Sequence, residues 1–435
     1  MTRKATPETQ QRIREAFRAL RDHSPGFRER KAQQYMMGQV ANTFAAAEGD
    51  GDEEAAAPPH VLLVEAGTGV GKSLGYLVPG IVAAQERELN LVVATGTVAL
   101  QEQLVDADLP KLAEHSGLAF RAHLAKGRGR YFCPATAQRQ MSEDAPEADL
   151  FGLAPASGQL STDEQELLRR LYHAHADGSW AGDLDRWPEP IPDAVRRRIT
   201  TSSSGCPGRH RCASGNECPF YLDRDALEGA DVVVANHDLV LADLGLGGGA
   251  ILPAPDETLY VLDEGHRLAA RAREQFSLAA AVAASQEIME GIGSAVQQGH
   301  EAVAGVPEVS APDTDGVENA LHETGQALQD AYRQLQARFQ AEQFEEEVLR
   351  FALGTVDDGL RELAHNVVGP AGTALKSVRA TLRALDNALE QADPDTLATL
   401  NDLRPKLTMA EERLANLADT WRAFADPDPE GVAPM

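Results

Sequence analysis

The chain has 435 residues, a formal net charge of −27 at pH 7 and 4 cysteines. Its length allows roughly two to four domains with a sizeable core, and its acidity argues against a broad basic surface for nucleic acid, so local patches must decide that question. No apolar run approaches the ~20 residues of a membrane span and no signal segment opens the chain, so we expect a cytoplasmic protein without membrane contact.

The first predicted elements are two helices. Residues 1–31 carry more Lys and Arg than Asp and Glu, and Glu8 to Leu20 has a weak amphipathic pattern. Either a solvated helix or a helix that contacts phosphates explains this pattern. A second helix is expected from Tyr35 to Ala46, and the acidic stretch from Glu48 to Pro59 reads as a surface loop.

An apolar run from Val61 to Val64 predicts a buried strand that leads into a glycine-rich loop. The loop fits the P-loop pattern except that alanine replaces the first glycine. Its glycines let backbone N–H groups turn toward a triphosphate, while Lys72 is expected to reach the terminal phosphates and Ser73 to bind Mg²⁺. An incidental turn is a poor explanation, because apolar residues follow the loop as a plausible buried helix. The predicted ATP-binding residues of the loop are Ala66, Gly67, Thr68, Gly69, Val70, Gly71, Lys72 and Ser73.

Arg30 and Gln33 precede this loop in an Arg-x-x-Gln arrangement. A glutamine amide can pair with both N6 and N7 of adenine, so the arrangement suits recognition of the base. Both residues are therefore predicted to contact ATP, although the pattern alone has low specificity.

Two further buried strands are predicted, from Leu91 to Thr97 and from Asp231 to His237. The first is followed by a helix from Val98 to Leu104, and this alternation indicates a parallel sheet with crossover helices. Thr95 and Thr97 end the strand where ligands bind in open α/β sheets. They either cap the next helix or contact the phosphates of a nucleic acid.

The second half of the nucleotide site is predicted where the strand from Thr258 to Leu262 ends in two adjacent carboxylates. Asp263 is expected to hold Mg²⁺ through water, and Glu264 to polarise the water that attacks the γ-phosphate. A P-loop kinase or transferase is disfavoured, because Glu264 implies water as the nucleophile. His266 either links nucleotide state to the rest of the domain or is a surface histidine. The predicted catalytic residues are Lys72, Asp263, Glu264 and His266.

All four cysteines lie between the two halves of this site, in a gap longer than a compact nucleotide domain needs. Cys133, Cys206, Cys212 and Cys218 lie among Gly, Arg, Ser and Pro rather than in apolar runs, unlike most buried structural cysteines. We therefore expect an inserted module in which four thiolates surround one site. Disulfides are disfavoured in a chain with no export signal. The wide spacing suits an iron–sulfur cluster better than zinc, but zinc and a site without metal stay open.

Cationic and aromatic residues alternate beside these cysteines. Arg128, Arg130, Tyr131 and Phe132 precede the first cysteine, and the segment from Arg209 to Tyr221 repeats the mixture. Single-stranded nucleic acid is bound in this way, with cations along the backbone and rings stacked on bases. The alternative is that Tyr131 and Phe132 cover the metal site.

The sequence resembles the DinG family of bacterial DNA helicases, which are relatives of the XPD-like iron–sulfur helicases of superfamily 2. The matching motifs follow the family's order between residues 27 and 270. They are Arg30 with Gln33, Glu65 to Ser73, Thr97 to Gln103, Lys126 to Cys133, the other three cysteines, Val232 to His237 and Asp263 to His266. The last motif has glycine where the wider superfamily has alanine, which keeps every polar role.

The resemblance implies an α/β fold with a RecA-like parallel-sheet P-loop domain at residues 1–125 and 222–268. A four-cysteine iron–sulfur domain would be inserted at 126–221, an all-α arch domain would follow at 269–435, and the second RecA-like domain of the family would be absent. The implied cofactors are ATP, Mg²⁺ and a [4Fe–4S] cluster on the four cysteines, with zinc as the alternative. The implied DNA-contacting residues are Thr95, Thr97, Arg128, Arg130, Tyr131, Asn236 and His237.

Residues 268–435 carry three apolar stripes with spacings of three and four, which predict amphipathic helices packed against one another. Turns are expected at Pro307 to Gly316 and at Gly369 to Gly372, and Asp426 to Glu430 reads as an exposed tail. The stripes are Leu321, Gly325, Leu328, Tyr332, Leu335 and Phe339; Leu375, Val378, Leu382, Leu385 and Leu389; and Leu400, Leu403, Leu407, Ala410, Leu414, Leu417 and Trp421.

The activity that the resemblance implies is ATP-driven 5′→3′ unwinding of forked duplex DNA or DNA–RNA hybrids, with translocation on single-stranded DNA. Because no second motor domain follows the helices, we expect these 435 residues to bind ATP weakly, carry the cluster and bind single strands without unwinding. We expect a monomer, with a single-stranded-DNA-binding protein as a candidate partner. The alternative is a metal-bearing protein that binds single-stranded nucleic acid and uses its ATP site only as a switch.

Overall fold

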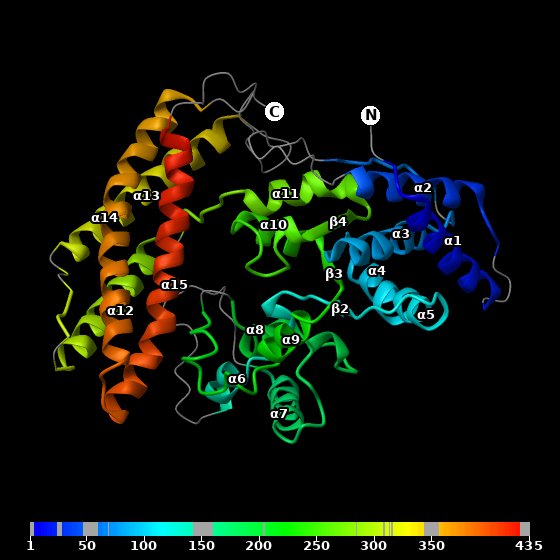
Figure 1. Cartoon of the computed structure of the whole chain (residues 1–435). Helices are drawn as coiled ribbons and strands as arrows, with labels where there is room; N and C mark the ends of the chain where they lie inside the picture. Colours follow the sequence, from blue (N-terminus) through cyan, green and yellow to red (C-terminus); the bar gives the residue numbers. More distant parts are fainter. Residues whose placement is uncertain are drawn as a thin grey trace. The chain divides into compact units, whose positions relative to one another are not determined.

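The computed structural model divides the chain into two compact units, which are described separately (Figure 1). Unit 1 comprises Met1–Gly127 and Phe220–Ser277, and unit 2 comprises Arg128–Pro219 and Leu278–Met435. The cysteine-bearing segment and the C-terminal helices fall in the same unit, so their separation into two domains stays a prediction. The structure describes residues 4–23, 28–46, 60–67, 69–141, 160–202, 205–283, 285–307, 309–312, 314, 316–342 and 356–426. The predicted ATP contact Thr68, the predicted loop from Glu48 to Pro59 and most of the predicted tail lie outside these residues.

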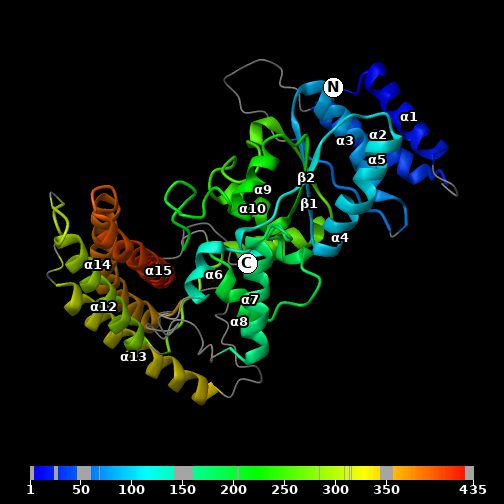
Figure 2. The same ribbon diagram turned by 90° about the horizontal axis from the view of Figure 1, so that it is seen from below.

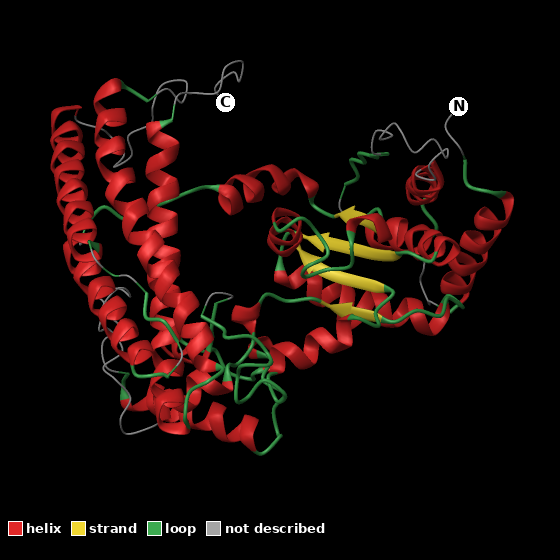
Figure 3. Cartoon of the chain, turned by 60° about the vertical axis from the view of Figure 1, so that its left-hand side comes forward, coloured by secondary structure: helices red, strands yellow, loops and turns green. Residues whose placement is uncertain are grey.

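Among its described residues, unit 1 contains a four-stranded parallel sheet, which confirms the predicted α/β class (Figure 3). The strands are β1 (Asn90–Thr95), β2 (Ala122–Leu124), β3 (Val232–Asn236) and β4 (Thr258–Leu262). Their spatial order is β2-β3-β1-β4, so β1 pairs with β3 on one side and with β4 on the other. The register places Thr95 opposite Asn236, at the carboxyl edge where ligands bind in open α/β sheets.

Helices cover both faces of this sheet, with α1, α2, α3 and α5 on one side and α9 and α10 on the other (Figure 2). Leu91 and Val93 face the first core while Val92 and Ala94 face the second, so β1 is buried on both faces and reads as a continuous apolar run. The helical elements of unit 1 are α1 (Pro7–Asp22), α2 (Lys31–Ala46), α3 (Lys72–Arg87), α4 (Val98–Gln103), the π-helical turn η1 (Leu104–Asp108), α5 (Leu109–His115), α9 (Pro219–Leu227), α10 (His237–Gly245), the 3₁₀ turns η4 (Pro255–Glu257) and η5 (Gly265–Arg267), and α11 (Leu268–Phe276).

The predicted buried strand from Val61 to Val64 is wrong for this structure. Residues 60–67 form no strand, and Val61, Leu63 and Val64 are 72%, 92% and 44% exposed. Leu62 packs against the core as a partly buried side chain. Local apolarity favours burial, but a strand also needs a neighbour to pair with, and among the described residues β4 pairs with β1 alone.

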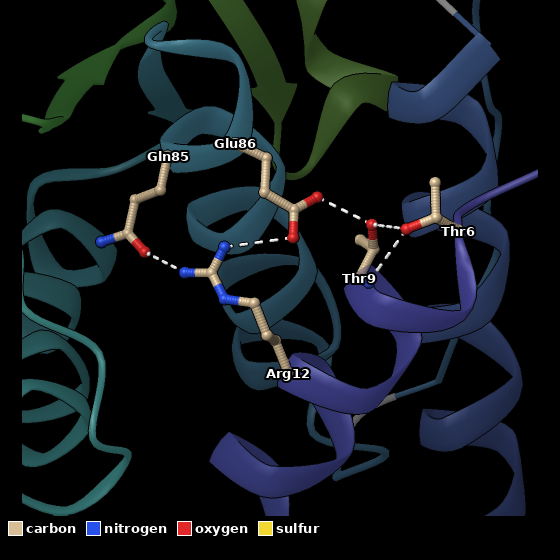
Figure 4. Close-up of polar contacts among 5 residues, drawn as sticks. All are labelled: Thr6, Thr9, Arg12, Gln85 and Glu86. Carbon is tan, nitrogen blue, oxygen red and sulfur yellow. Dashed lines mark hydrogen bonds and ion pairs between the residues drawn. The ribbon is translucent and has the colours of Figure 1, made fainter.

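A polar network anchors α1 to the C-terminal end of α3 (Figure 4). Thr9 Oγ1 donates to Glu86 Oε2 at 2.7 Å, while Arg12 donates to Glu86 Oε1 at 3.1 Å and to Gln85 Oε1 at 2.9 Å. The opposite end of α3 begins at the glycine-rich loop. The N-terminal helix is therefore packed against the nucleotide domain, with one arginine already held in an ion pair.

The cysteine-bearing part of unit 2 folds around a small apolar core that includes Phe132, which is 1% exposed. The Phe132 ring meets Trp180 edge-on, with 5.6 Å between the ring centroids. Ser161 and Glu164 form a capping box at the start of the longest helix in this part. The elements are η2 (Arg128–Arg130), α6 (Pro134–Met141), α7 (Thr162–Ala176), η3 (Leu184–Arg186) and α8 (Asp193–Ile199).

The C-terminal part of unit 2 consists of α12 (Ser285–Ala304), α13 (Val317–Glu342), α14 (Asp358–Leu389) and α15 (Pro394–Ala425), packed around one apolar core. All seven residues of the third predicted stripe are buried in this core, which confirms that stripe despite Pro405. In the first stripe, however, Tyr332 is 42% exposed, and the side chain of Phe339 lies outside the described part of the chain.

The turn predicted at Gly369 to Gly372 is wrong, because α14 continues through these residues. Val367, Ala371 and Ala374 are fully buried in the core of the helices, and this packing outweighs the weak helix propensity of glycine and proline. No described helix combines the length and the apolarity that a membrane crossing requires.

Candidate nucleotide site

The glycine-rich loop and α3 form the first half of the site. Gly69 and Gly71 have φ angles of 79° and 88°, which glycine adopts without steric cost. A Cβ atom on Gly71 would lie 2.3 Å from Gln33 Nε2, so any larger residue there would displace the Gln33 amide. α3 begins at Lys72 without a side-chain cap, and uncapped N–H groups next to a lysine favour an anion such as phosphate.

Gln33 lies beneath this loop rather than open to solvent. It is 2% exposed, its Nε2 donates to Gly71 O at 2.8 Å, and its Oε1 is buried without a hydrogen-bond partner in the described structure. Arg30, just before α2, is exposed. Pairing of Gln33 with adenine would require its amide to turn away from the loop, so this contact stays a prediction.

Lys72 and Glu264 join the two halves of the site. Lys72 Nζ lies 3.0 Å from Glu264 Oε1, and the two side chains are 30% and 28% exposed. The hydrogen bond and then the charge of Lys72 hold the pKa of Glu264 below its usual value. Glu264 has a φ angle of 55°, a conformation that is uncommon outside glycine and often found at functional sites. His266 Nδ1 is 3.4 Å from Glu264 Oε2 and its side chain is 67% exposed.

Asp263 is held at four points. Its N–H donates to Ala94 O at 2.8 Å, and its carbonyl oxygen lies 2.9 Å from His237 Nε2. Oδ1 accepts from the backbone N–H of Glu264 at 3.0 Å. Oδ2 accepts from the hydroxyl of Tyr76 at 3.2 Å. The carboxylate therefore has a defined orientation beside the Lys72–Glu264 pair.

Sequence reasoning missed Tyr76 and Asp108. Tyr76 is one turn into α3 and 3% exposed, and burial first and Asp263 second raise the pKa of its phenol far above the usual value, so the hydroxyl keeps its proton. Asp108 ends the π-helical turn η1; burial raises the pKa of its carboxyl, while hydrogen bonds from Ser73 and Gln103 act in the opposite sense. A tyrosine within an apolar helix was a signal available in the sequence, whereas nothing local marked Asp108.

The residues of unit 1 that were predicted to contact DNA make hydrogen bonds inside the domain. Thr95 is fully buried and donates to Thr97 O at 3.1 Å. The side chains of Thr97 and Asn236 accept from backbone N–H groups as the N-caps of α4 and α10. His237 is 1% exposed. Capping therefore explains Thr97 and Asn236, and a direct DNA contact by Thr95 or His237 would require exposure of a buried side chain.

The four cysteines are all partly buried. Arg128 Nη1 donates to Cys206 Sγ at 3.1 Å, and Thr136 Oγ1 donates to Cys133 Sγ at 3.2 Å. Burial is the main reason why the pKa of the Cys212 thiol is raised, and the neighbouring Cys133 and Cys206 raise it further. Across the described residues, however, no group of three or more His, Cys, Asp or Glu side chains is arranged to hold a metal ion.

Arg130 and Tyr131 are largely buried inside unit 2 and contact other residues there. Arg130 forms an ion pair with Asp185 at 2.6 Å, with both side chains 19% exposed. Tyr131 is 4% exposed, and stacking on a base requires an exposed ring face. The burial of Tyr131 and Phe132 therefore argues against stacking on bases, and their role in covering a metal site stays a prediction.

A glycine-rich loop leading into a helix, a lysine at its end and two carboxylates after a parallel strand are typical of a P-loop nucleotide-binding domain. No family model matches the chain. The chain is 32% identical over 438 residues to the ATP-dependent DNA helicase DinG of Photobacterium profundum, an alignment that covers 97% of this chain and 58% of that protein. It is 39% identical over 272 residues to the protein of the same name from Escherichia coli (strain K12), and over 273 residues to that from Salmonella choleraesuis, in each case over 62% of this chain and 36% of the relative. These relatives confirm the resemblance to DinG helicases, and the chain spans little more than half the length of the first of them.

Proposed function

We propose that this chain is the ATP-binding portion of a DNA helicase of the DinG type. The observation that carries the proposal is the 3.0 Å contact between Lys72 of the loop and Glu264, beside an Asp263 carboxylate of defined orientation. These side chains come from positions 191 and 192 residues apart in the sequence (263 − 72 and 264 − 72). Their convergence at the carboxyl edge of a parallel sheet is typical of a site for phosphoanhydride hydrolysis.

In this function each residue has a separate task. Lys72 leaves Glu264 and binds the terminal phosphates. Glu264 then orients the attacking water and accepts its proton. Ser73 and Asp263 would hold Mg²⁺, and the bound ion would neutralise the charge that develops on the phosphates. The hydroxyl and the carboxylate are oxygen donors of the kind that Mg²⁺ prefers, so the residues fit the ion.

For the cysteine-bearing part we propose a [4Fe–4S] cluster held by Cys133, Cys206, Cys212 and Cys218. The donor set supports this proposal, because such clusters take four thiolates and are tuned by hydrogen bonds to sulfur, such as the one from Arg128 to Cys206. Zinc, the alternative, would need the four sulfurs about 2.3 Å from one point. The described residues form no group of three or more such ligands for either metal, so the choice of the cluster rests on the donor set and its spacing.

The proposed substrate is DNA, as the names of the relatives state for those proteins. Single strands would follow the cationic segments next to the cysteines, and forked duplexes or DNA–RNA hybrids would be the unwound forms. The helices α12 to α15 would then help to enclose the strand. The alternative of an ATP switch without motor activity has no observation in its favour.

The test compares the unaltered chain with Lys72→Ala. We expect the chain to bind a fluorescent ATP analogue in the presence of Mg²⁺ and to hydrolyse ATP faster when a single-stranded oligonucleotide is added. Lys72→Ala should lose both properties and still bind the oligonucleotide, whereas Lys4→Ala, at an exposed lysine of the same unit, should behave like the unaltered chain. Hydrolysis that ignores single-stranded DNA, or nucleotide binding that survives Lys72→Ala, would overturn the proposal.

A further inference from the structure

Tyr76 connects the apolar core of unit 1 to the acidic end of β4. Its ring is part of the core that joins α1, α2 and α3 to the sheet, and the residue is 3% exposed. Its hydroxyl leaves this core and donates to Asp263 Oδ2 at 3.2 Å.

The position of Tyr76 in α3 suggests a function for this contact. Tyr76 is three residues after Ser73 and four after Lys72, so it lies one helical turn beyond both. Tyr76 therefore bonds to Asp263 from the same face of α3 that carries Ser73.

We propose that Tyr76 is a positioning residue for Mg²⁺, fixing the carboxylate of Asp263 relative to the helix that carries Ser73. This inference rests on the proposed function of the site. The backbone N–H of Glu264 already holds Oδ1, and Tyr76 holds Oδ2, so the carboxylate cannot rotate freely about its side-chain bonds. Each oxygen keeps a further lone pair for the ion or for its water.

The need for such positioning follows from the coordination chemistry of Mg²⁺. The ion requires near-ideal octahedral geometry and tolerates misplaced ligands poorly. Asp263 follows the end of β4, while Ser73 lies on α3, so the two groups that would hold the ion or its water belong to different elements. A hydrogen bond between those elements fixes the position of the Asp263 carboxylate relative to α3 before the ion arrives.

The experiment measures binding of a fluorescent ADP analogue as a function of Mg²⁺ concentration. Tyr76→Phe keeps the ring in the core and removes the hydroxyl. We expect this variant to need about tenfold more Mg²⁺ for half-maximal binding, the effect of losing a hydrogen bond to a charged group. Binding in EDTA should be unchanged, because the loop and Lys72 are untouched. A purely structural role would instead weaken binding with and without the ion and lower the thermal midpoint.

Tyr260→Phe is the matched control, since Tyr260 lies on β4 itself and packs against the core on the other face of the sheet. It should leave the Mg²⁺ dependence unchanged. Asp263→Glu moves the carboxylate away from the phenol, so adding Tyr76→Phe to it should have little further effect. Equal Mg²⁺ dependence of Tyr76→Phe and the unaltered chain, or fully additive effects in the double variant, would overturn the inference alone. Absence of Mg²⁺-dependent binding by the unaltered chain would overturn the proposed function and the inference with it.

Discussion

Replacement of Glu264 by glutamine separates two effects of one carboxylate. In the structure Glu264 Oε1 is paired with Lys72 Nζ at 3.0 Å, so Glu264 competes with the phosphates of ATP for the positive charge of Lys72. In the proposed reaction the same carboxylate accepts the proton of the attacking water. Glu264→Gln should therefore strengthen nucleotide binding while it stops hydrolysis.

The size of the binding effect follows from the geometry of the pair. Two unit charges about 4 Å apart near a protein surface interact by about 4 kcal/mol before desolvation and ordering are counted. With both side chains nearly one-third exposed, measured values for such pairs suggest a net contribution of about 1 kcal/mol at most. Removing the competition should then tighten ATP binding by about fivefold. Loss of a general base should slow hydrolysis by about 10²- to 10⁴-fold.

Titration with a fluorescent ATP analogue gives the affinity, and phosphate release gives the hydrolysis rate. Because Lys72 lowers the pKa of Glu264, the carboxylate is ionised from about pH 6 to pH 8, and the gain in affinity should be constant over that range. Glu257→Gln, at an exposed glutamate before β4, should change neither quantity. Weaker binding by Glu264→Gln, or hydrolysis at the unaltered rate, would refute the reasoning.

Three further predictions concern other parts of the chain. Asp357 caps α14, and a hydrogen bond from Arg338 holds the pKa of the Asp357 carboxyl well below its usual value. Asp357→Ala should therefore lower the free energy of unfolding by about 1 kcal/mol at pH 7. Because the pKa of Asp357 is lower in the folded than in the unfolded chain, its carboxylate stabilises the fold at pH values above the unfolded pKa of about 3.9. This stabilisation is lost as the pH falls through the folded pKa. The difference between Asp357→Ala and the unaltered chain in thermal unfolding should therefore shrink near pH 3. Asp358→Ala is the control, and a difference that is independent of pH would contradict the role of the carboxylate. Glu86→Ala removes the acceptor of the buried Thr9 hydroxyl and should destabilise unit 1 by about 1 kcal/mol in urea unfolding, whereas Glu86→Gln should cost less; equal losses would argue against the network in Figure 4. Anaerobically purified protein should be brown with about four irons per chain, and Cys206→Ser should lose iron while ATP binding persists; stoichiometric zinc would contradict the cluster.

The motifs predicted which side chains of the candidate site lie close together where the chemistry is local. The glycines before Lys72 and the paired carboxylates after β4 can be recognised in the sequence by residue type and spacing. In the structure Lys72, Asp263 and Glu264 lie close together. The apolar runs likewise predicted β1, β3 and β4. For β1 and β3 the reason is burial on both faces, which leaves few polar positions.

The parts that could not be predicted depend on contacts between distant segments. Whether Val61 to Val64 forms a strand depends on a neighbouring strand, and whether Gly369 to Gly372 forms a turn depends on the helices packed around it. The burial of His237 and the bond from Tyr76 to Asp263 likewise exist only after the sheet and its helices have assembled. Local patterns carry no information on such partners.

A crystal structure of the chain with Mg²⁺ and a non-hydrolysable ATP analogue tests the central claim most directly. We expect Lys72 Nζ to leave Glu264 and bind the terminal phosphate, with Mg²⁺ held by Ser73 and Asp263. A nucleotide bound elsewhere, or a Lys72 that stays paired with Glu264 while nucleotide fills the loop, would contradict it.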